Sequence, residues 1–332
     1  MAGRERVLFV HINPEGVSFV QKDLALLSKH FDVREIVYRS RRDVLRVAGG
    51  TIWADATFSW FAWDQAAWAT RFSRLFRRKS IVLVGGFDVV SMPEISYGNL
   101  LHSRPAARTK YAILKAHKVL AVSNSLKSDA ERFTGRRDIQ VVYHGFNAEE
   151  FKPSGSKEPI ALSVGGVNKT TMKRKGIETF MKSAFHAPEV SFRLVGGIEP
   201  ALLSEIKQSA PPNLELVGRV DQNTLVREMQ RAAVYVQVSA HEGFGCSLAE
   251  AMLCGAMPVV TRAGAIPEVV GETGIYVPFE DPRATADGVR RALKSPDGGA
   301  ARKRIAELFP IEKRERELVA AVREVLGESD GD

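Results

Sequence analysis

Cysteine is scarce in this 332-residue sequence, and long apolar segments are missing from it. The two cysteines, Cys246 and Cys254, are too few for a disulfide framework or a thiolate metal site, so we interpret both as reduced packing residues. No run approaches the roughly 18 apolar residues that a membrane-spanning helix needs. The apolar segment 7–12 is followed too soon by Pro14 and Glu15 to resemble a signal peptide. We therefore expect a cytoplasmic protein.

Three familiar motifs for phosphate or metal binding are also missing. The loop after the first apolar segment contains a single glycine, Gly16, and no G-x-G-x-x-G pattern. The segment GGVNKT at 165–170 does not match G-x-x-x-x-G-K-[ST], which excludes a P-loop. An Asp-x-Asp pair occurs only as Asp330 and Asp332, where we expect terminal disorder and not a metal site.

The sequence does contain a regular alternation of short apolar strands and helices. We predict strands at 7–12, 32–38, 56–60, 81–84, 118–122, 140–143, 160–164, 192–195, 214–217, 234–238 and 257–261. Such alternation is typical of α/β folds with parallel sheets, and it continues on both sides of a Pro-, Gly- and Ser-containing charged stretch at 151–158. We expect two Rossmann-like domains, 1–152 and 153–305, and a C-terminal helix at 306–332 that could pack back on the first domain.

The excess of positive charge lies in the first half of the chain. Residues 1–150 hold 23 Lys and Arg against 15 Asp and Glu, and the remaining residues hold 24 of each. All four tryptophans fall at 53–68, and five cations follow at 71–79. The basic charge suits either contact with an anionic membrane surface or simple solubility. The tryptophans and cations suit either an interfacial membrane helix or a core-packed helix with a solvated face, and we favour the core-packed helix. No recognition motif supports nucleic-acid binding.

Four cations, Lys169, Lys173, Arg174 and Lys175, precede Gly176 where a strand is expected to lead into a helix. Backbone N–H groups and the helix dipole favour an anion at such a junction. A phosphate or diphosphate is the natural ligand, and a solvated charged turn is the alternative.

Two carboxylates, Glu242 and Glu250, belong to a predicted strand–loop–helix–strand unit over 234–261. The first lies on a loop beyond the carboxyl end of a strand and the second in the first turn of the next helix, so both could reach one pocket. Carboxylates repel a diphosphate, because at about 4 Å and an effective dielectric near 20 each like-charged pair costs about 4 kcal/mol. We therefore expect them to bind hydroxyl groups, as in a nucleotide sugar. For Glu250 the alternative is a capping box with Ser247.

The segment E-G-F-G-C-S-L-A-E-A-M at 242–252 is followed by C-G-A-M-P-V-V, G-A-I-P-E-V-V and G-I-Y-V-P. Together they resemble the E-x7-E region of the retaining GT-B glycosyltransferases of family 4, glycosyl transferases group 1. Supporting matches lie at 122–133, 139–153, 175–176 and 192–197, so the resemblance covers much of the chain. It implies the GT-B architecture, in which two Rossmann-like α/β domains face each other across a cleft. The second domain would bind mainly the donor and the first mainly the acceptor.

The resemblance also implies roles for individual residues. Glu242 would contact the donor sugar near the reacting carbon, and Glu250 would bind ribose hydroxyls. Lys175 would hold the diphosphate. Backbone amides would face the sugar or phosphate at Phe244, Gly245 and Cys246.

The sequence departs from the family pattern on both sides of the expected site. The family usually has an arginine shortly before the Lys-Gly element, and here Lys169, with Lys173 as the second choice, takes its place with a point charge instead of a bidentate fork. The family often has an acceptor-side histidine, for which Asp88 is the candidate here, with His102 in reserve. Gly16 matches the family's first glycine loop and is our remaining donor-binding candidate.

We therefore predict an enzyme that moves a sugar from a nucleotide-diphosphate sugar to an acceptor hydroxyl with retained anomeric configuration, without a cofactor or metal. Glu242, Lys175 and Asp88 are the predicted catalytic residues. A carbohydrate, a lipid-linked molecule or a small metabolite could be the acceptor, and the basic first domain favours one at the inner face of a membrane. A nucleotide-sugar epimerase, a glycosyl phosphorylase and a donor-binding protein without transfer activity remain as alternatives.

Overall fold

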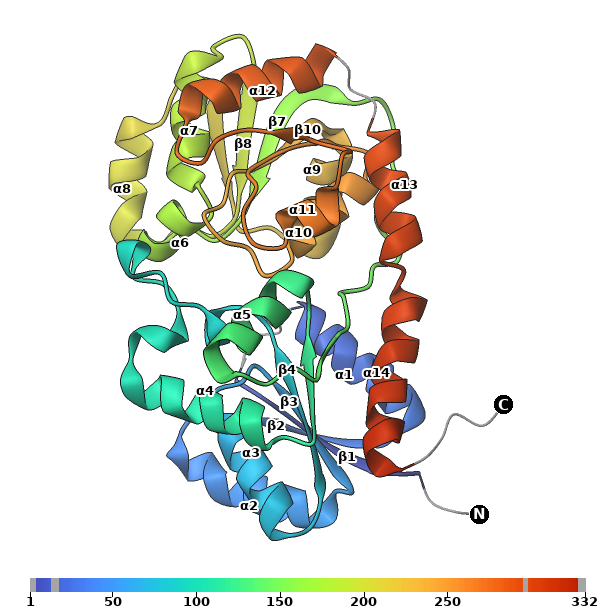
Figure 1. Ribbon diagram of the computed structural model, residues 1–332. Coiled ribbons are helices and arrows are strands. Elements are labelled where there is room, and N and C mark those ends of the chain that lie inside the picture. Colours follow the sequence, from blue (N-terminus) through green and yellow to red (C-terminus); the bar gives the residue numbers. More distant parts are fainter. Residues whose placement is uncertain (1–3, 13–17, 295–297, 328–332) are drawn as a thin grey trace. The chain divides into compact units, whose positions relative to one another are not determined.

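The computed structural model describes residues 4–12, 18–294 and 298–327. The chain divides into two compact units: unit 1 comprises Met1–Gly145 with Ile311–Asp332, and unit 2 comprises Phe146–Pro310 (Figure 1). Each unit contains a six-stranded parallel sheet flanked by helices. The α/β class and the two Rossmann-like sheets expected from the sequence are confirmed.

The sheet of unit 1 has the strand order β2-β1-β3-β4-β5-β6. Its strands are β1 (Arg6–His11), β2 (Asp32–Val37), β3 (Ala56–Trp60), β4 (Lys79–Val84), β5 (Lys118–Ala121) and β6 (Ile139–Val141). The central strands are continuous apolar runs buried along most of their length, as expected for a parallel sheet that is covered on both faces. The order reverses between β1 and β3.

The helices of unit 1 are α1 (Ser18–His30), α2 (Val44–Trp53), α3 (Asp64–Leu75), α4 (Ser103–Lys115), α5 (Asn124–Thr134) and α14 (Ile311–Leu326). The four tryptophans are distributed over different elements, and Trp60 on β3 is fully buried. The guanidinium of Arg34 lies 3.9 Å from the ring centre of Trp53. The cluster of tryptophans in the sequence is therefore not one membrane-facing helix.

A buried ion pair attaches α14 to the rest of unit 1. The guanidinium of Arg314 donates to both carboxylate oxygens of Asp23 on α1, at 2.6 Å each, and to the carbonyl oxygens of Val142 and Tyr143. The indole Nε1 of Trp60 donates to the same carboxylate at 2.8 Å. Because every member of this network is bonded, the buried charges are compensated.

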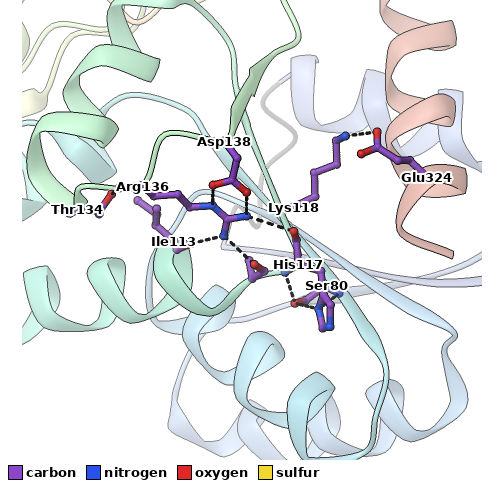
Figure 2. Close-up of polar contacts among 9 residues, drawn as sticks. Ser80, Ile113, His117, Lys118, Thr134, Arg136, Asp138 and Glu324 are labelled. Atoms are coloured by element: carbon purple, nitrogen blue, oxygen red, sulfur yellow. Dashed lines mark hydrogen bonds and ion pairs between the residues drawn. The ribbon is translucent and has the colours of Figure 1, made fainter. Parts of the chain in front are cut away.

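A second set of contacts within unit 1 involves the end of α4, strand β5 and helix α14 (Figure 2). Arg136 donates to the carbonyl oxygens of Ile113 and Ala116 at 2.7 Å, so its guanidinium caps the end of α4, and it also pairs with Asp138. Lys118 on β5 pairs with Glu324 on α14. The C-terminal helix is thus held to unit 1 at two separate places.

The sheet of unit 2 has the strand order β12-β11-β10-β7-β8-β9. Its strands are β7 (Glu158–Val164), β8 (Ser191–Val195), β9 (Leu214–Gly218), β10 (Ala232–Gln237), β11 (Met257–Val260) and β12 (Ile275–Tyr276). Its helices are α6 (Lys169–Arg174), α7 (Ile177–His186), α8 (Pro200–Ser209), α9 (Gln222–Arg231), α10 (Cys246–Leu253), α11 (Ile266–Val270), α12 (Pro282–Lys294) and α13 (Gly299–Leu308). The apolar sides of α7 and α12 pack together on one face of this sheet.

The units meet in the sequence a few residues from the expected domain boundaries, at 145/146 and 310/311 instead of 152/153 and 305/306. The stretch that we interpreted as a linker begins with Phe151, which is fully buried and whose carbonyl oxygen accepts a hydrogen bond from Arg302 of α13. Phe146 and Phe309 both pack against Phe244, so each end of unit 2 is anchored in its own core.

Candidate functional site

The strand order of unit 2 indicates where a ligand would bind. β8 and β9 extend the sheet on one side of β7, and β10, β11 and β12 extend it on the other. The connections after β7 and β10 therefore run to opposite faces, which opens a crevice at the carboxyl ends of these two strands. The segments that contain Lys175 and Glu242 both begin here.

Lys175 lies at the corner between α6 and α7. The next residue, Gly176, has a φ of +65°, and a Cβ there would lie 2.0 Å from the carbonyl oxygen of Val238, so this close packing requires glycine. The side chain of Lys175 runs along Gly165 at the end of β7, where an added Cβ would lie 3.1 Å from Cδ and 3.6 Å from Nζ. The ammonium is thus placed over the carboxyl end of β7, half-buried and without a paired carboxylate among the described residues.

The basic segment before Lys175 is the short helix α6, so the expectation of a charged loop is wrong. Asn168 and Thr171 cap the helix reciprocally, with each side chain accepting from the backbone N–H of the other at 2.9 Å. Lys169 and Lys173 are exposed on this helix. The donor-binding role of Lys169 stays a prediction.

The carboxylate of Glu242 is held in place by two neighbours. Gln237, the last residue of β10, donates from Nε2 to Oε2 at 3.1 Å, and Nη1 of Arg174 lies 3.7 Å from the same oxygen. The backbone carbonyl of Glu242 accepts from the N–H of Ala265 at 2.9 Å. Its side chain is 15% exposed, so the carboxylate is restrained but still accessible.

Tyr235 on β10 lies within electrostatic reach of both predicted carboxylates. Its hydroxyl donates to Oγ of Ser247 at 2.9 Å. Burial raises the pKa of Tyr235, and the charges of Glu250 and Glu242 raise it further, whereas the hydrogen bond to Ser247 acts in the opposite direction. Tyr235 is thus close enough to feel the charges of both Glu242 and Glu250, and the expectation that they share one pocket stays a prediction.

The capping-box interpretation of Glu250 is wrong. Helix α10 begins at Cys246 with Gly245 as its N-cap, so Ser247 lies inside the first turn and is bonded to Tyr235. Gly245 has a φ of +97°, which glycine adopts without strain. Glu250 itself is 7% exposed.

The three residues expected to present backbone amides lie at the start of α10. The ring of Phe244 is buried against Phe146 and Phe309, so only its backbone could face a ligand. Cys246 is half-buried and Gly245 has no side chain. The N–H groups of a helix's first turn favour an anion or a hydroxyl oxygen.

Asp88 in unit 1 has a structural explanation. Its fully buried carboxylate accepts from the backbone N–H groups of Ala62, Gly85 and Gly86, at 2.9, 3.2 and 2.7 Å. Burial raises the pKa of Asp88, and these three hydrogen bonds counteract that effect. These hydrogen bonds give the buried carboxylate of Asp88 a structural role in the turn after β4. Its role on the acceptor side stays a prediction.

The remaining candidates of unit 1 are less informative. His102 is exposed at the start of α4, and Gly16 lies outside the described residues. Within residues 4–12, 18–294 and 298–327, no group of three or more His, Cys, Asp or Glu could hold a metal ion. The helices described there include none that is long and apolar enough to cross a membrane.

Sequence reasoning missed the partners of Glu242. Arg174 was only one of four cations, and no pattern distinguished it from its neighbours. Gln237 falls inside the apolar strand predicted at 234–238, and only the structure shows that it ends β10, where a polar residue is a usable signal for a site.

Comparison with solved structures identifies the fold as GT-B, the architecture of many glycosyltransferases. The structure of Anabaena Alr3699/HepE in complex with UDP and glucose matches with a TM-score of 0.79 at 16% identity, over 96% of this chain and 100% of that one. Sucrose-phosphate synthase from Thermosynechococcus elongatus also matches with a TM-score of 0.79, at 19% identity, over 98% of this chain and 100% of that one.

Sequence comparison points to a particular family. Residues 158–295 match the family model described as glycosyl transferases group 1. N-acetyl-alpha-D-glucosaminyl L-malate synthase from Bacillus anthracis is 26% identical over 318 residues, 88% of this chain and 76% of that protein. Alpha-maltose-1-phosphate synthase from Mycolicibacterium smegmatis is 28% identical over 60% of each chain. These findings support a glycosyltransferase of the GT-B fold.

Proposed function

We propose that this protein is a retaining glycosyltransferase that takes its sugar from a nucleotide-diphosphate sugar. The observation that supports this most directly is the arrangement of Lys175 and Glu242 after the neighbouring strands β7 and β10. Lys175 offers a cation without a paired carboxylate among the described residues, which suits a diphosphate. Glu242 offers a restrained carboxylate, which suits the hydroxyl groups of a sugar.

The rest of the donor would be bound around this pair. The first N–H groups of α10, from Gly245 and Cys246, favour a phosphate or sugar oxygen. Glu250 would accept hydrogen bonds from the ribose, and Lys169 would add positive charge at the diphosphate. The solved complexes of Alr3699/HepE with UDP and with UDP-glucose make uridine nucleotides the first donors to test.

Catalysis in this proposal is mainly electrostatic. The bond between the anomeric carbon and the diphosphate breaks as the acceptor hydroxyl oxygen attacks from the same face, and the hydroxyl proton passes to the departing phosphate oxygen. Negative charge grows on the leaving phosphate before that proton arrives. Lys175 and the amides of α10 stabilise that charge, which is the part of the barrier that preorganised donors lower most. The chain's own cations neutralise the diphosphate, so the proposal invokes no metal or cofactor.

A panel of donors tests the proposal directly. Thermal unfolding is measured with UDP-glucose, UDP-N-acetylglucosamine, GDP-mannose and ADP-glucose. A ligand at 100 times its dissociation constant stabilises the folded chain by about 2.7 kcal/mol, which gives a clear shift of the melting temperature. If none of these donors shifts it, the assignment of the site is wrong.

Product analysis separates the proposed transfer from related reactions. Incubation with the best donor alone would give a new nucleotide sugar if the protein were an epimerase. Addition of inorganic phosphate would give a sugar phosphate if it were a phosphorylase. Donor binding without product against any acceptor would indicate a binding protein, which the missing family arginine and the occupied carboxylate of Asp88 would explain.

We further propose that the acceptor lies at an anionic membrane surface. A cavity of about 230 Å³ opens between α3 and α4, and its lining combines Trp68 and Tyr111 with Arg71 and Arg108. Leu75 and Leu114, at the ends of the same helices, are exposed. Aromatic and apolar side chains between cations are typical of surfaces that bind the interface of a bilayer.

Sedimentation with lipid vesicles tests this contact. The chain should bind vesicles that contain phosphatidylglycerol and not vesicles of phosphatidylcholine alone. Arg71→Glu should weaken binding about 30-fold, because it removes one positive charge and adds one negative charge, each worth about 1 kcal/mol near such a surface. The control is Arg227→Glu, the same change at an exposed position of α9. Equal binding by both variants would contradict the contact.

A further inference from the structure

Arg174 and Lys175 are adjacent in sequence but have different surroundings. The side chain of Lys175 runs along Gly165, whereas Nη1 of Arg174 lies 3.7 Å from Oε2 of Glu242 and donates to the carbonyl oxygen of His241 at 3.4 Å. The side chains of Arg174 and Glu242 are similarly buried, at 14% and 15% exposure. Arg174 therefore belongs to the carboxylate side of the candidate site.

The backbone reinforces this link. The carbonyl oxygen of Arg174 accepts from the N–H of Ala240 at 2.7 Å, and the carbonyl oxygen of Glu242 accepts from Ala265. A Cβ at Gly264, whose φ is +54°, would lie 2.2 Å from the carbonyl oxygen of Glu242. The end of α6 and the loop after β10 are consequently joined through main chain as well as side chain.

Gln237 approaches the same carboxylate from the end of β10. Its Nε2 donates to Oε2 of Glu242 at 3.1 Å, and the side chain is 5% exposed. An added Cβ at Gly245 would lie 3.4 Å from this nitrogen and 3.5 Å from Cγ of Glu242. The hydrogen bond from Gln237 and the ion pair with Arg174 both involve Oε2, and no hydrogen bond among the described residues reaches Oε1.

We propose that Arg174 and Gln237 are positioning residues that orient Glu242 toward the donor sugar. This inference rests on the proposed function. The hydrogen bond from Gln237 and the ion pair with Arg174 hold one carboxylate oxygen in place, and the charge of Arg174 offsets that of Glu242 beside an anionic diphosphate. Arg174 and Lys175 are consecutive residues at the end of α6. The proposed diphosphate ligand, Lys175, is therefore directly linked to the residue that positions the proposed sugar ligand, Glu242.

The decisive measurement compares a nucleotide sugar with its bare nucleoside diphosphate. The probes are UDP-glucose and UDP, or the corresponding pair for whichever panel donor stabilises the wild-type chain most. Arg174→Ala should lower kcat/KM for the nucleotide sugar roughly 10–100-fold, because it leaves a mostly buried carboxylate without its cation. The Kd of the bare diphosphate should change less than 3-fold.

Lys207→Ala is the control, because Lys207 is an exposed cation of α8, outside the candidate site, with no ion pair among the described residues. This variant should keep wild-type kcat/KM. Gln237→Leu should resemble Arg174→Ala in direction, and Arg174→Lys should recover part of the activity. The double variant Arg174→Ala/Glu242→Gln should be no worse than Glu242→Gln alone, because the positioned group is already changed.

Other outcomes overturn the inference separately from the proposed function. If Arg174→Ala weakens UDP as much as UDP-glucose, Arg174 binds the diphosphate directly. If its loss adds fully to that of Glu242→Gln, the two residues are not coupled. If the wild-type chain binds no nucleotide sugar, the proposed function fails. The same double-mutant cycle in ligand-free thermal unfolding then still decides whether Arg174 holds Glu242, since additive melting shifts would refute the pairing.

Discussion

The two units contain similar parallel sheets but use the point where the strand order reverses in different ways. In unit 1 this point is filled: Trp60 stacks on His144 with ring centroids 5.9 Å apart and bonds to Asp23. In unit 2 the corresponding point leaves Lys175 and Glu242 partly exposed. In unit 1 the polar groups at this point are thus bonded to one another and to an arginine of α14. In unit 2 the polar groups at this point remain accessible to a ligand.

The largest expected effect concerns the stability of unit 1. Arg314→Ala should destabilise the fold by about 3–5 kcal/mol, because it leaves the buried carboxylate of Asp23 without its cation. Denaturant unfolding of the purified variant measures the loss. Arg316→Ala, an exposed arginine of the same helix, is the control and should change stability by less than about 0.5 kcal/mol. Similar stability of both variants would mean that α14 is not held by this network.

In unit 2, Lys175→Ala should impair turnover and leave stability almost unchanged. Turnover should fall about 100-fold, the size of losing one preorganised donor to developing negative charge, while the melting temperature stays close to wild type. Steady-state kinetics with the donor found in the panel measures the effect, and Lys207→Ala, which changes an exposed cation of α8, serves as the control. Normal turnover by Lys175→Ala would show that the diphosphate is bound elsewhere.

The difference between the units also predicts how stability depends on pH. Burial, and then the positive charges of Arg314 and Lys22, hold the pKa of His144 well below its ordinary value of 6.5. The unfolded chain therefore takes up this proton first, so the contribution of His144 is fully present above pH 6.5 and is lost as the pH falls below that value. The loss is at most about 1.4 kcal/mol per pH unit.

Unfolding of His144→Phe at pH 7.5 and 5.5 tests this dependence. The variant should lose less stability than the wild type between these two pH values. His102→Phe, which changes an exposed histidine, should keep the wild-type dependence. If His144→Phe also keeps it, another buried group controls the acid sensitivity.

The fold was largely predictable from the sequence because strands that are buried on both faces are continuous apolar runs. The runs at 7–12, 81–84 and 234–238 gave strands at nearly those positions. The boundary between the units was less predictable. Phe151 sits in a segment whose composition is typical of linkers, and only tertiary packing shows that it is core.

The candidate site was predictable as a set of segments but not as a set of contacts. The βαβ pattern predicts that Lys175 and Glu242 follow strands of one parallel sheet, and the structure shows that these strands, β7 and β10, are neighbours. The pairing of Arg174 and Gln237 with Glu242 depends on side-chain directions at the end of α6 and β10, which spacing alone does not determine. For Asp88 the sequence offered no sign that three backbone amides would occupy its carboxylate.

The smallest expected effect tests whether Glu250 serves the ligand or the fold. Ser247 is not its capping partner, and the proposed function assigns its carboxylate to the ribose hydroxyls. Glu250→Gln should weaken the nucleotide roughly 3–10-fold, because an amide replaces a charged acceptor of ribose hydroxyls, with little change of melting temperature. Calorimetric titration with the nucleotide of the best donor measures this. Unchanged affinity combined with a clearly lower melting temperature would assign Glu250 to the core of unit 2.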